Sequence, residues 1–455
     1  MFKELNYTRK NFERESKDKG ITLIALIITV IMLLILAGTA ITLSINGGDL
    51  FEKPESAKNK WNNATLKEEV QLALMLNWQE PTLKERLDPI SGAEVEKVNV
   101  LNDVCYVTKG DSVVTVYEDG DILDGKVEVW DGTSISSPEF KKVNDVWNWY
   151  IYKPSQLKFL ADFVNNGRSL NQKLEQKVKE EGYTDTSIVS LTNTTEVHLM
   201  NNLDMGAREG IGETPEQKWE TDANKNVKWT PIGSEINNNT ITSKSFPCLF
   251  EGNNYTIRGL YVNESEAEEG YAGLFAGRTE AVWHLTLKSS YIKGKAAGGI
   301  ALLNRQRFKE CSIVDSVVIA TEASAGGIVI VSWGNISDCT NYNTSVYGQR
   351  YVGGIIGQKN SSSKTVGGCK NTGTVTGKNN VGGIIGQSHN NIFTTITGCT
   401  NEGEIHASNF YCGGIVGNGK VSITNSHNTG TIICEGNQAG RNNRKCNARY
   451  YNNRM

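Results

Sequence analysis

The most apolar part of the chain is the uncharged run from Ile21 to Ile45, in which three positions of every five are Leu, Ile or Val. As a helix, this run would be roughly 37 Å long, more than the hydrocarbon core of a bilayer at about 30 Å. Six Lys or Arg residues precede it, and the first charge beyond it is Asp49. The cytoplasmic bias of positive charge predicts residues 1–20 inside the cell, residues 21–45 across the membrane and the rest outside.

A secretory signal peptide is the alternative interpretation of this apolar run. The apolar region of a signal peptide is shorter, about 7–15 residues. Gly38-Thr39-Ala40 nevertheless has the small side chains of a cleavage site, and cleavage there would start the mature chain at Ile41. The length of the run favours the membrane helix.

After the run, the hydrophobic spacing becomes helical and then alternates as in strands. Four apolar residues recur every four positions in a polar stretch: Leu66, Val70, Leu74 and Trp78. This spacing predicts a helix over 56–79, which Pro81 ends. Residues 95–123 are rich in Val, Thr and Tyr, with turns at Gly110 and Gly120, and predict an antiparallel sheet. Residues 46–130 are therefore predicted to be a helix followed by a small β domain.

Residues 131–245 are predicted to be a linker and a lead-in to a second architecture. Pro138 lies in a turn-rich stretch that marks the boundary. A short amphipathic helix follows over 157–164, and Asn165-Asn166-Gly167 is typical of a helix end because these residues tolerate positive φ. Residues 197–205 are predicted to be a strand.

From residue 246 to residue 440 the chain repeats a pair of glycines before apolar residues, as in Val352-Gly353-Gly354-Ile355-Ile356-Gly357. The copies align at six glycines, and the differences between their successive residue numbers are 26, 28, 27, 29 and 31: Gly273, Gly299, Gly327, Gly354, Gly383 and Gly414. Short β-branched strands between Gly and Asn corners, at a slightly drifting period, predict a β-solenoid. A Gly at a fixed corner allows close backbone approach in every coil.

A second element follows each glycine pair and adds two further columns of equivalent residues. One column is Cys311, Cys339, Cys369, Cys399 and Ser426; the other is Asn341, Asn371, Asn401 and Asn428. The Cys spacing matches the coil period and differs from zinc-binding CxxC pairs, which favours an internal stack, and Ser426 supports packing over chemistry. Disulfides between neighbouring coils and a metal site remain alternatives. The Asn column is either stacked internally or, if exposed, a ladder for a carbohydrate ligand.

The start of the apolar run carries a more specific pattern. A basic leader ends in Lys19-Gly20, and Ile21-Thr22-Leu23-Ile24 follows at once. This resembles the type IV prepilin leader. The resemblance implies cleavage after Gly20 by a prepilin peptidase, methylation of the new amine on Ile21, pilus subunits as partners, and a long helix with a small sheet. The family has Phe where Ile21 stands and Glu where Ala25 stands, and the missing Glu favours a tip subunit or a plain membrane anchor over the pilus shaft.

The glycine repeats have a family resemblance of their own. Together with the lead-in segments 229–233, 250–257 and 259–262, they resemble the GLUG repeats of bacterial surface proteins over roughly residues 140–440. The resemblance implies secretion and a surface role, commonly adhesion to a glycan or protein ligand of a host or the environment. It implies no reaction.

Composition narrows the remaining function classes. With 47 Lys+Arg against 50 Asp+Glu the net charge is −3, whereas nucleic-acid binding requires a basic face, so we expect no nucleic-acid partner. Nine Cys in 455 residues are too sparse for a disulfide scaffold. We expect no metal and no cofactor.

A polysaccharide-cleaving β-helix enzyme is the alternative function. Hydrolysis of a glycosidic bond needs two carboxylates, and lyases commonly need acidic calcium ligands. Only four acidic residues lie between Gly326 and Gly436: Asp338, Glu402, Glu404 and Glu435. Glu402 and Glu404 face one way on a strand but form a weak pair, so we predict adhesion without catalysis.

The final residues, 441–455, depart from the repeat. Ala439-Gly440 begins another glycine pair, but Arg441-Asn442-Asn443-Arg444 follows in place of Gly-Ile-Ile-Gly. If the codons for these four residues are read one base later, the first encodes Gly and the second and third each encode Ile or Thr. The fourth then encodes Gly or Glu. The tail is therefore either a frameshifted end of a longer repeat array or a genuine basic segment.

The sequence thus predicts a mainly β protein with a transmembrane, pilin-like N-terminal helix, a small antiparallel sheet and a parallel β-helix-like solenoid. The predicted coil length is the spacing of the aligned glycines, 26 to 31 residues, which lies within the range typical of repeat architectures.

Overall fold

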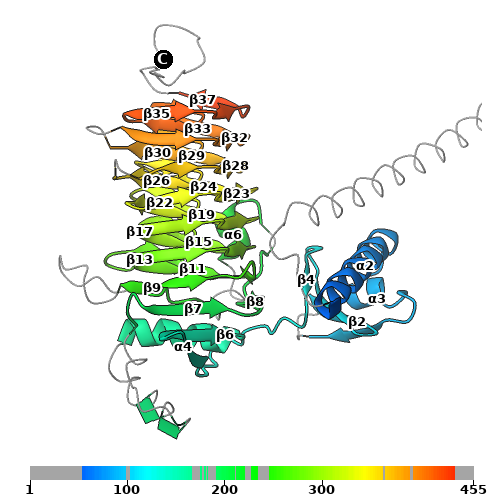
Figure 1. Cartoon of the computed structure of the whole chain (residues 1–455). Helices are drawn as coiled ribbons and strands as arrows, with labels where there is room; N and C mark the ends of the chain where they lie inside the picture. Colours follow the sequence, from blue (N-terminus) through cyan, green and yellow to red (C-terminus); the bar gives the residue numbers. More distant parts are fainter. Residues whose placement is uncertain are drawn as a thin grey trace, which may run out of the picture. The chain divides into compact units, whose positions relative to one another are not determined.

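The computed structural model describes most of the chain beyond the apolar run (Figure 1). The described residues are 54–98, 103–166, 191–210, 212–220, 227–233, 245–361, 364–389 and 393–435, with short pieces at 175–176, 179–180 and 182. The predicted leader, apolar run and atypical tail lie outside these residues, so those interpretations stay predictions. Among the described helices, none combines the length and apolar character that a bilayer span requires.

The predicted helix and small sheet are both present. Helix α2 spans Pro54–Leu76 and ends ahead of Pro81. Leu66 and Val70 are buried as the spacing predicts, but Trp78 lies beyond the helix end and is 69% exposed. The following short helix α3 (Leu83–Leu87) starts with a capping box between Thr82 and Glu85. The chain divides into two compact units at Glu68 and Glu69, within α2.

The small sheet is antiparallel, and its strand order follows the sequence. Its strands are β1 (Glu94–Lys97), β2 (Val104–Lys109), β3 (Ser112–Tyr117) and β4 (Ile122–Asp124). Gly110 and Gly120 occupy the predicted turns with positive φ of 60° and 86°, a backbone conformation that favours glycine. Val104, Val107 and Val114 are fully buried in this sheet.

The rest of the described chain winds into a β-solenoid of three sheets, and from β9 onward the coils contribute strands to all three sheets. The 8-stranded sheet contains β8 (Leu203–Asp204), β10 (Thr256–Arg258), β14 (Thr286–Lys288), β18 (Ser312–Val314), β23 (Thr340–Tyr342), β28 (Lys370–Asn371), β32 (Thr400–Asn401) and β36 (His427–Asn428). The 11-stranded sheet contains β11 (Tyr261–Glu264), β12 (Tyr271–Ala272), β15 (Tyr291–Gly294), β16 (Ala296–Gly298), β19 (Val317–Ala320), β20 (Ala325–Gly326), β24 (Ser345–Gly348), β25 (Val352–Gly353), β29 (Val375–Gly382), β33 (Ile405–Gly413) and β37 (Ile432–Cys434).

The 14-stranded sheet contains β5 (Glu139–Val143), β6 (Val146–Ile151), β7 (Thr195–Leu199), β9 (Phe246–Glu251), β13 (Phe275–Trp283), β17 (Ala301–Lys309), β21 (Val329–Ser332), β22 (Asn335–Ser337), β26 (Ile356–Lys359), β27 (Val366–Gly367), β30 (Ile385–Ser388), β31 (Thr394–Thr397), β34 (Val416–Asn418) and β35 (Val421–Thr424). Strands β5 to β8 precede residue 246, so the solenoid sheets begin inside the segment that the sequence indicated as a lead-in. Two helices also lie in that segment, α4 (Pro154–Asn166) and α6 (Pro215–Trp219).

The strand register confirms a parallel solenoid built on the glycine pairs. Five glycines pair in succession from coil to coil: Gly298, Gly326, Gly353, Gly382 and Gly413. Each of them directly precedes one of the glycines Gly299 to Gly414 that the sequence aligned, so the coil lengths equal the predicted spacings. Parallel strands of neighbouring coils lie about 4.8 Å apart, so equivalent residues of successive coils stack on one another.

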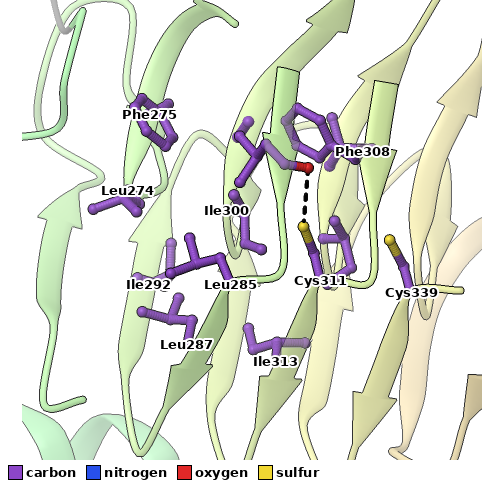
Figure 2. Close-up of a cluster of buried hydrophobic side chains, with 14 of the residues drawn as sticks. Leu274, Phe275, Leu285, Leu287, Ile292, Ile300, Phe308, Cys311, Ile313 and Cys339 are labelled. Atoms are coloured by element: carbon purple, nitrogen blue, oxygen red, sulfur yellow. Dashed lines mark hydrogen bonds between the residues drawn. The ribbon is translucent and has the colours of Figure 1, made fainter. Parts of the chain in front are cut away.

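One continuous hydrophobic core fills the solenoid. Leu285 comes from one coil and Phe308 and Ile313 from the next, and all three point into the same interior (Figure 2). Helix α4 covers the end of the stack at β6, where Leu160 and Phe163 join the same core as Trp149. The predicted helix is thus confirmed, and its apolar face closes the first coil.

Candidate functional site

The groove with the most regular lining crosses five coils of the 11-stranded sheet. It has a volume of about 550 Å³. Equivalent three-residue segments at β19, β24, β29 and β33 line it, and the fifth coil, at β37, contributes two residues. Its lining is Ile319, Ala320, Thr321, Tyr347, Gly348, Gln349, Thr376, Gly377, Lys378, His406, Ala407, Ser408, Ile433 and Glu435. The groove therefore runs along the stacking direction, across the strands.

The local sequence explains why a groove forms at this position. In β29 the side chain of Val375 is buried and that of Thr376 is half-buried, and Gly377 is buried next to a register shift against β33. A Cβ atom on Gly377 would lie 2.6 Å from Cγ2 of Val352, and one on Gly348 would lie 2.9 Å from the same atom. The middle position of the lining segment is therefore restricted to small residues, which are Ala320, Gly348, Gly377 and Ala407 in four of the coils.

The two walls of the groove carry mostly polar side chains. One wall is the outward row Ile319, Tyr347, Thr376, His406 and Ile433; the other is Thr321, Gln349, Lys378, Ser408 and Glu435. His406 Nε2 lies 3.0 Å from Glu404 Oε1, beside the lining. The lining thus combines one lysine and one glutamate with hydroxyl, amide and imidazole groups.

Among the described residues, the groove lining holds a single carboxylate, Glu435. Glu402 and Glu404 do not act as a pair in this structure. Glu402 lies 2.9 Å from Lys370 Nζ, and Glu404 contacts His406. The arrangement therefore offers hydrogen-bonding groups for a ligand and lacks the two facing carboxylates that glycoside hydrolysis uses.

The predicted repeat glycines lie where neighbouring coils approach each other most closely. A Cβ atom on Gly299, Gly327, Gly354 or Gly383 would lie 2.0–2.2 Å from the carbonyl oxygen of the equivalent glycine in the next coil, and one on Gly414 would lie 2.4 Å from Cβ of Asn428. Real Cβ atoms do not approach other atoms so closely, so a side chain has no room at these corners.

The predicted Cys column is an internal stack. Cys311, Cys339, Cys369 and Cys399 are buried free thiols, and Figure 2 shows Cys311 and Cys339 side by side in the core. Each Sγ lies 3.4–3.6 Å from the carbonyl oxygen two residues earlier, and Ser426 Oγ makes the same contact at 2.9 Å. Burial raises the pKa of the Cys339 thiol well above its usual range, as expected for an unreactive thiol.

The Asn column also lies inside the solenoid. Asn341, Asn371 and Asn401 are 0% exposed. Asn371 Nδ2 donates to Asn401 Oδ1 at 2.7 Å, and Asn401 Nδ2 donates to Asn428 Oδ1 at 2.6 Å. Of the two alternatives for this column, the structure shows internal stacking. The exposed carbohydrate ladder is wrong, because a ligand outside the solenoid does not reach these buried amides.

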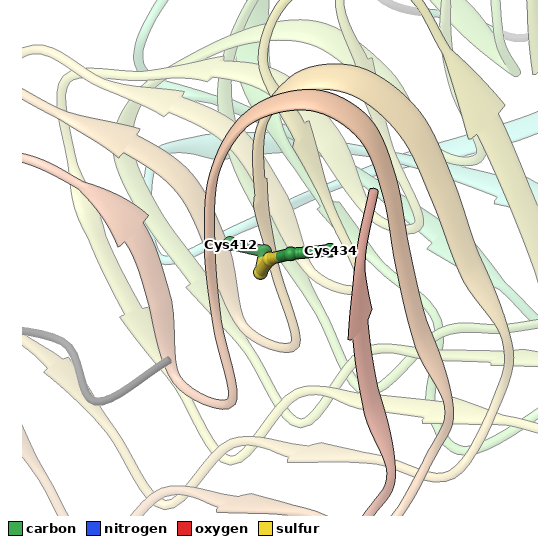
Figure 3. Close-up of a disulfide and its surroundings, with 2 residues drawn as sticks. All are labelled: Cys412 and Cys434. Carbon is green, nitrogen blue, oxygen red and sulfur yellow. A yellow bond between two sulfur atoms is a disulfide. The ribbon is translucent and has the colours of Figure 1, made fainter. Parts of the chain in front are cut away.

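A disulfide between Cys412 and Cys434 was not predicted from the sequence (Figure 3). It joins β33 to β37, and its Cα atoms are 6.3 Å apart. Cys412 occupies the position of Val381 in the previous coil. The only available signal was therefore the appearance of Cys at a position that is otherwise apolar.

A second hollow, of about 860 Å³, lies where the turn between β3 and β4 meets the first solenoid coils. Arg258 is buried there, stacks 3.6 Å from the Tyr117 ring centroid and pairs with Asp119. Arg208 binds Asp204 through both guanidinium nitrogens, at 2.8 and 2.6 Å. These charges pair mainly with one another, which is typical of a structural clamp between two parts of the chain.

Comparison with known proteins adds little to this picture. No protein-family model matches the chain, and no curated protein matches it. Among solved structures, one described as a putative immunoglobulin A1 protease from Bacteroides ovatus is similar over 63% of this chain and 77% of its own, with 17% sequence identity and a TM-score of 0.44. At that score the likeness carries no argument about what this chain binds or does.

Proposed function

We propose that this chain is a surface protein of the bacterial envelope whose solenoid binds an extended polymer without cleaving it. The observation that carries the proposal is the groove, which is lined by equivalent positions of five successive coils. A site built from equivalent positions of a stack is suited to a ligand that is itself a linear repeat. The proposed role is adhesion or display.

The proposed location rests on the N-terminal sequence and on the disulfide. The uncharged run over 21–45 after a basic leader supports a single membrane anchor with the solenoid outside. The Cys412–Cys434 disulfide supports an oxidising compartment. We further propose cleavage after Gly20, which would make the chain a pilus-associated subunit. Mass spectrometry of the mature protein should find Ile21 at its N-terminus; a start at Ile41 would contradict this step.

Cells that display the full chain should adhere to a polymer-coated surface, and a blocked groove should abolish adhesion. We expect Thr376→Trp to reduce adhesion at least tenfold, because an indole at this position fills the middle of the groove. Thr395→Trp is the matched control, since Thr395 is an exposed strand residue of β31 in a different sheet. Surfaces coated with chitin, cellulose or gelatin serve as probes.

Two results would overturn the proposed function. If cells with and without the chain adhere equally to all three surfaces, the chain is not an adhesin for these polymers. If soluble reducing ends or unsaturated sugars accumulate over chitin or cellulose in proportion to the purified chain, the polysaccharide-cleaving alternative replaces it.

A further inference from the structure

We propose that the groove binds a linear, uncharged glycan that lies along the stacking direction, with one pyranose ring over each coil. This inference names the ligand class of the proposed binding function and rests on it. The arguments come from the spacing of the coils, the chemistry of the two walls, the charge of the lining and the pairing of the strands beneath.

The spacing of the lining favours sugar rings over peptide residues. Adjacent strands of a sheet lie about 4.8 Å apart, so the five lining segments span roughly 19 Å between the first and the last. A pyranose ring in an extended polymer advances by about the distance between two coils. An extended peptide advances about 3.3 Å per residue and repeats its side-chain direction after two residues. Its repeat therefore does not match the distance between neighbouring coils.

The walls provide hydrogen-bonding groups on both edges of each ring position. In three successive coils the lining pairs, two residues apart on the same segment, are Tyr347 with Gln349, Thr376 with Lys378, and His406 with Ser408. The ring of Tyr347 adds an apolar surface at one position, and Ile433 adds apolar surface at one end, whereas Ile319 at the other end is only 7% exposed. Polar side chains at regular intervals, with apolar surface beside them, are what a ring with hydroxyls at its edges and C–H groups on its faces requires.

The charge of the lining argues for an uncharged polymer. Lys378 and Glu435 offset each other, and His406 contacts Glu404 beside the groove. A polyanion such as a nucleic acid or a polyuronate needs a run of cations along its backbone. The lining offers one lysine in five coils.

The strands beneath the groove exclude a peptide that would bind as an added strand. β24 pairs with β19 on one side and β29 on the other, and β29 pairs in turn with β33. Addition of a peptide strand requires a free strand edge. Among the described residues, β19, β24, β29 and β33 are paired on both sides, and only β37 at one end of the groove keeps an unpaired edge. A strand added there would lie alongside β37 and therefore across the groove, not along it.

Titration of the purified full chain with sugars of defined length tests the inference. The probes are chito-oligosaccharides and cello-oligosaccharides of two to seven rings, followed by calorimetry. Affinity for at least one series should rise with every ring up to about five, the number of coils in the groove, and then level off. We expect Thr376→Trp to weaken binding of the five-ring sugar at least tenfold and Thr395→Trp to leave it unchanged, with thermal midpoints equal to the parent chain.

Failure of this inference differs from failure of the proposed function. Affinity that does not depend on length, an equal loss in both variants, or tighter binding of oligogalacturonides or of an extended peptide would overturn the glycan assignment. If no oligosaccharide binds but cells still adhere in a Thr376→Trp-sensitive way, the groove takes another polymer and only the ligand class is wrong.

Discussion

Replacing Gly383 by alanine should destabilise the solenoid by at least about 3 kcal/mol, at the upper end of the usual cost of overpacking. A Cβ atom at this position would lie 2.1 Å from the Gly414 carbonyl oxygen and 2.4 Å from Cγ of Asn401. One obstacle is backbone in the next coil, and the other is an amide in the buried Asn column. Neither moves without breaking inter-coil hydrogen bonds, so the thermal midpoint should fall by several degrees.

Gly367→Ala is the matched control for this prediction. Gly367 lies in β27 of the same solenoid, and a Cβ atom there would have its nearest neighbour, Thr397 Cγ2, at an ordinary 3.5 Å. Thermal unfolding of both variants, followed by tryptophan fluorescence, measures the difference. Equal midpoints for the two variants would show that close approach at the glycine pairs does not hold the coils together.

The buried amine of Lys359 should lower the free energy of unfolding at neutral pH. Its side chain is 0% exposed and belongs to an inward column with Asn304 and Ser332. Nζ donates to the Gly334 carbonyl oxygen at 2.9 Å, and among the described residues the only charged group that affects its pKa is another lysine, Lys364. Burial, with a smaller contribution from Lys364, lowers the pKa of Lys359 to about 7.

The sign of the resulting pH dependence is fixed by this lowered pKa. Between pH 7 and about 10 the unfolded chain carries a proton on Lys359 that the folded chain lacks, so the free energy of unfolding should rise with pH by up to about 1.4 kcal/mol per unit. Below pH 7 both states are protonated, and the penalty stays constant at a value on the order of 4 kcal/mol.

Lys359→Met should remove this penalty. The variant should be more stable than the parent chain at pH 7 by a few kcal/mol, and its rise in stability between pH 7 and 10 should be smaller by the contribution of Lys359. Ser332 Oγ still donates to the Gly334 carbonyl oxygen at 3.2 Å, so the lost hydrogen bond leaves no orphaned acceptor. Lys420→Met, at an exposed lysine, serves as control. If both variants keep the pH profile of the parent chain, Lys359 is not buried as described.

The solenoid was predictable because its glycine pairs do the same physical task in every coil. Gly354 and Gly383 recur where backbones of neighbouring coils meet, and no other residue fits there. The Cys and Asn columns recur for the same reason, since stacked positions face identical surroundings. The strand predicted over 197–205 is confirmed as β7 and β8, which a short break separates. Strands β5 and β6 were missed because they contain no copy of the repeat.

The groove was not predictable because its outward row has no shared residue type. Tyr347, Thr376 and His406 hold equivalent positions, and side chains that face solvent are free to vary from coil to coil. The small residues in the middle of the lining segment, such as Gly348 and Gly377, were visible in the sequence but could not be distinguished from the glycines of the inter-coil contacts. Only the folded coil shows which glycine shapes the outer surface.

Hydroxyl-radical footprinting of the full chain, with and without chitohexaose or cellohexaose, tests most directly whether the groove is the binding site. Tyr347 and His406 lie on the groove wall, whereas Tyr342 and Trp333 are 55% and 52% exposed outside the groove lining. The groove account predicts that the sugar protects Tyr347 and His406 from oxidation and leaves Tyr342 and Trp333 unchanged. Unchanged oxidation of Tyr347 and His406 under saturating sugar, or protection of Tyr342 or Trp333 in their place, would contradict it.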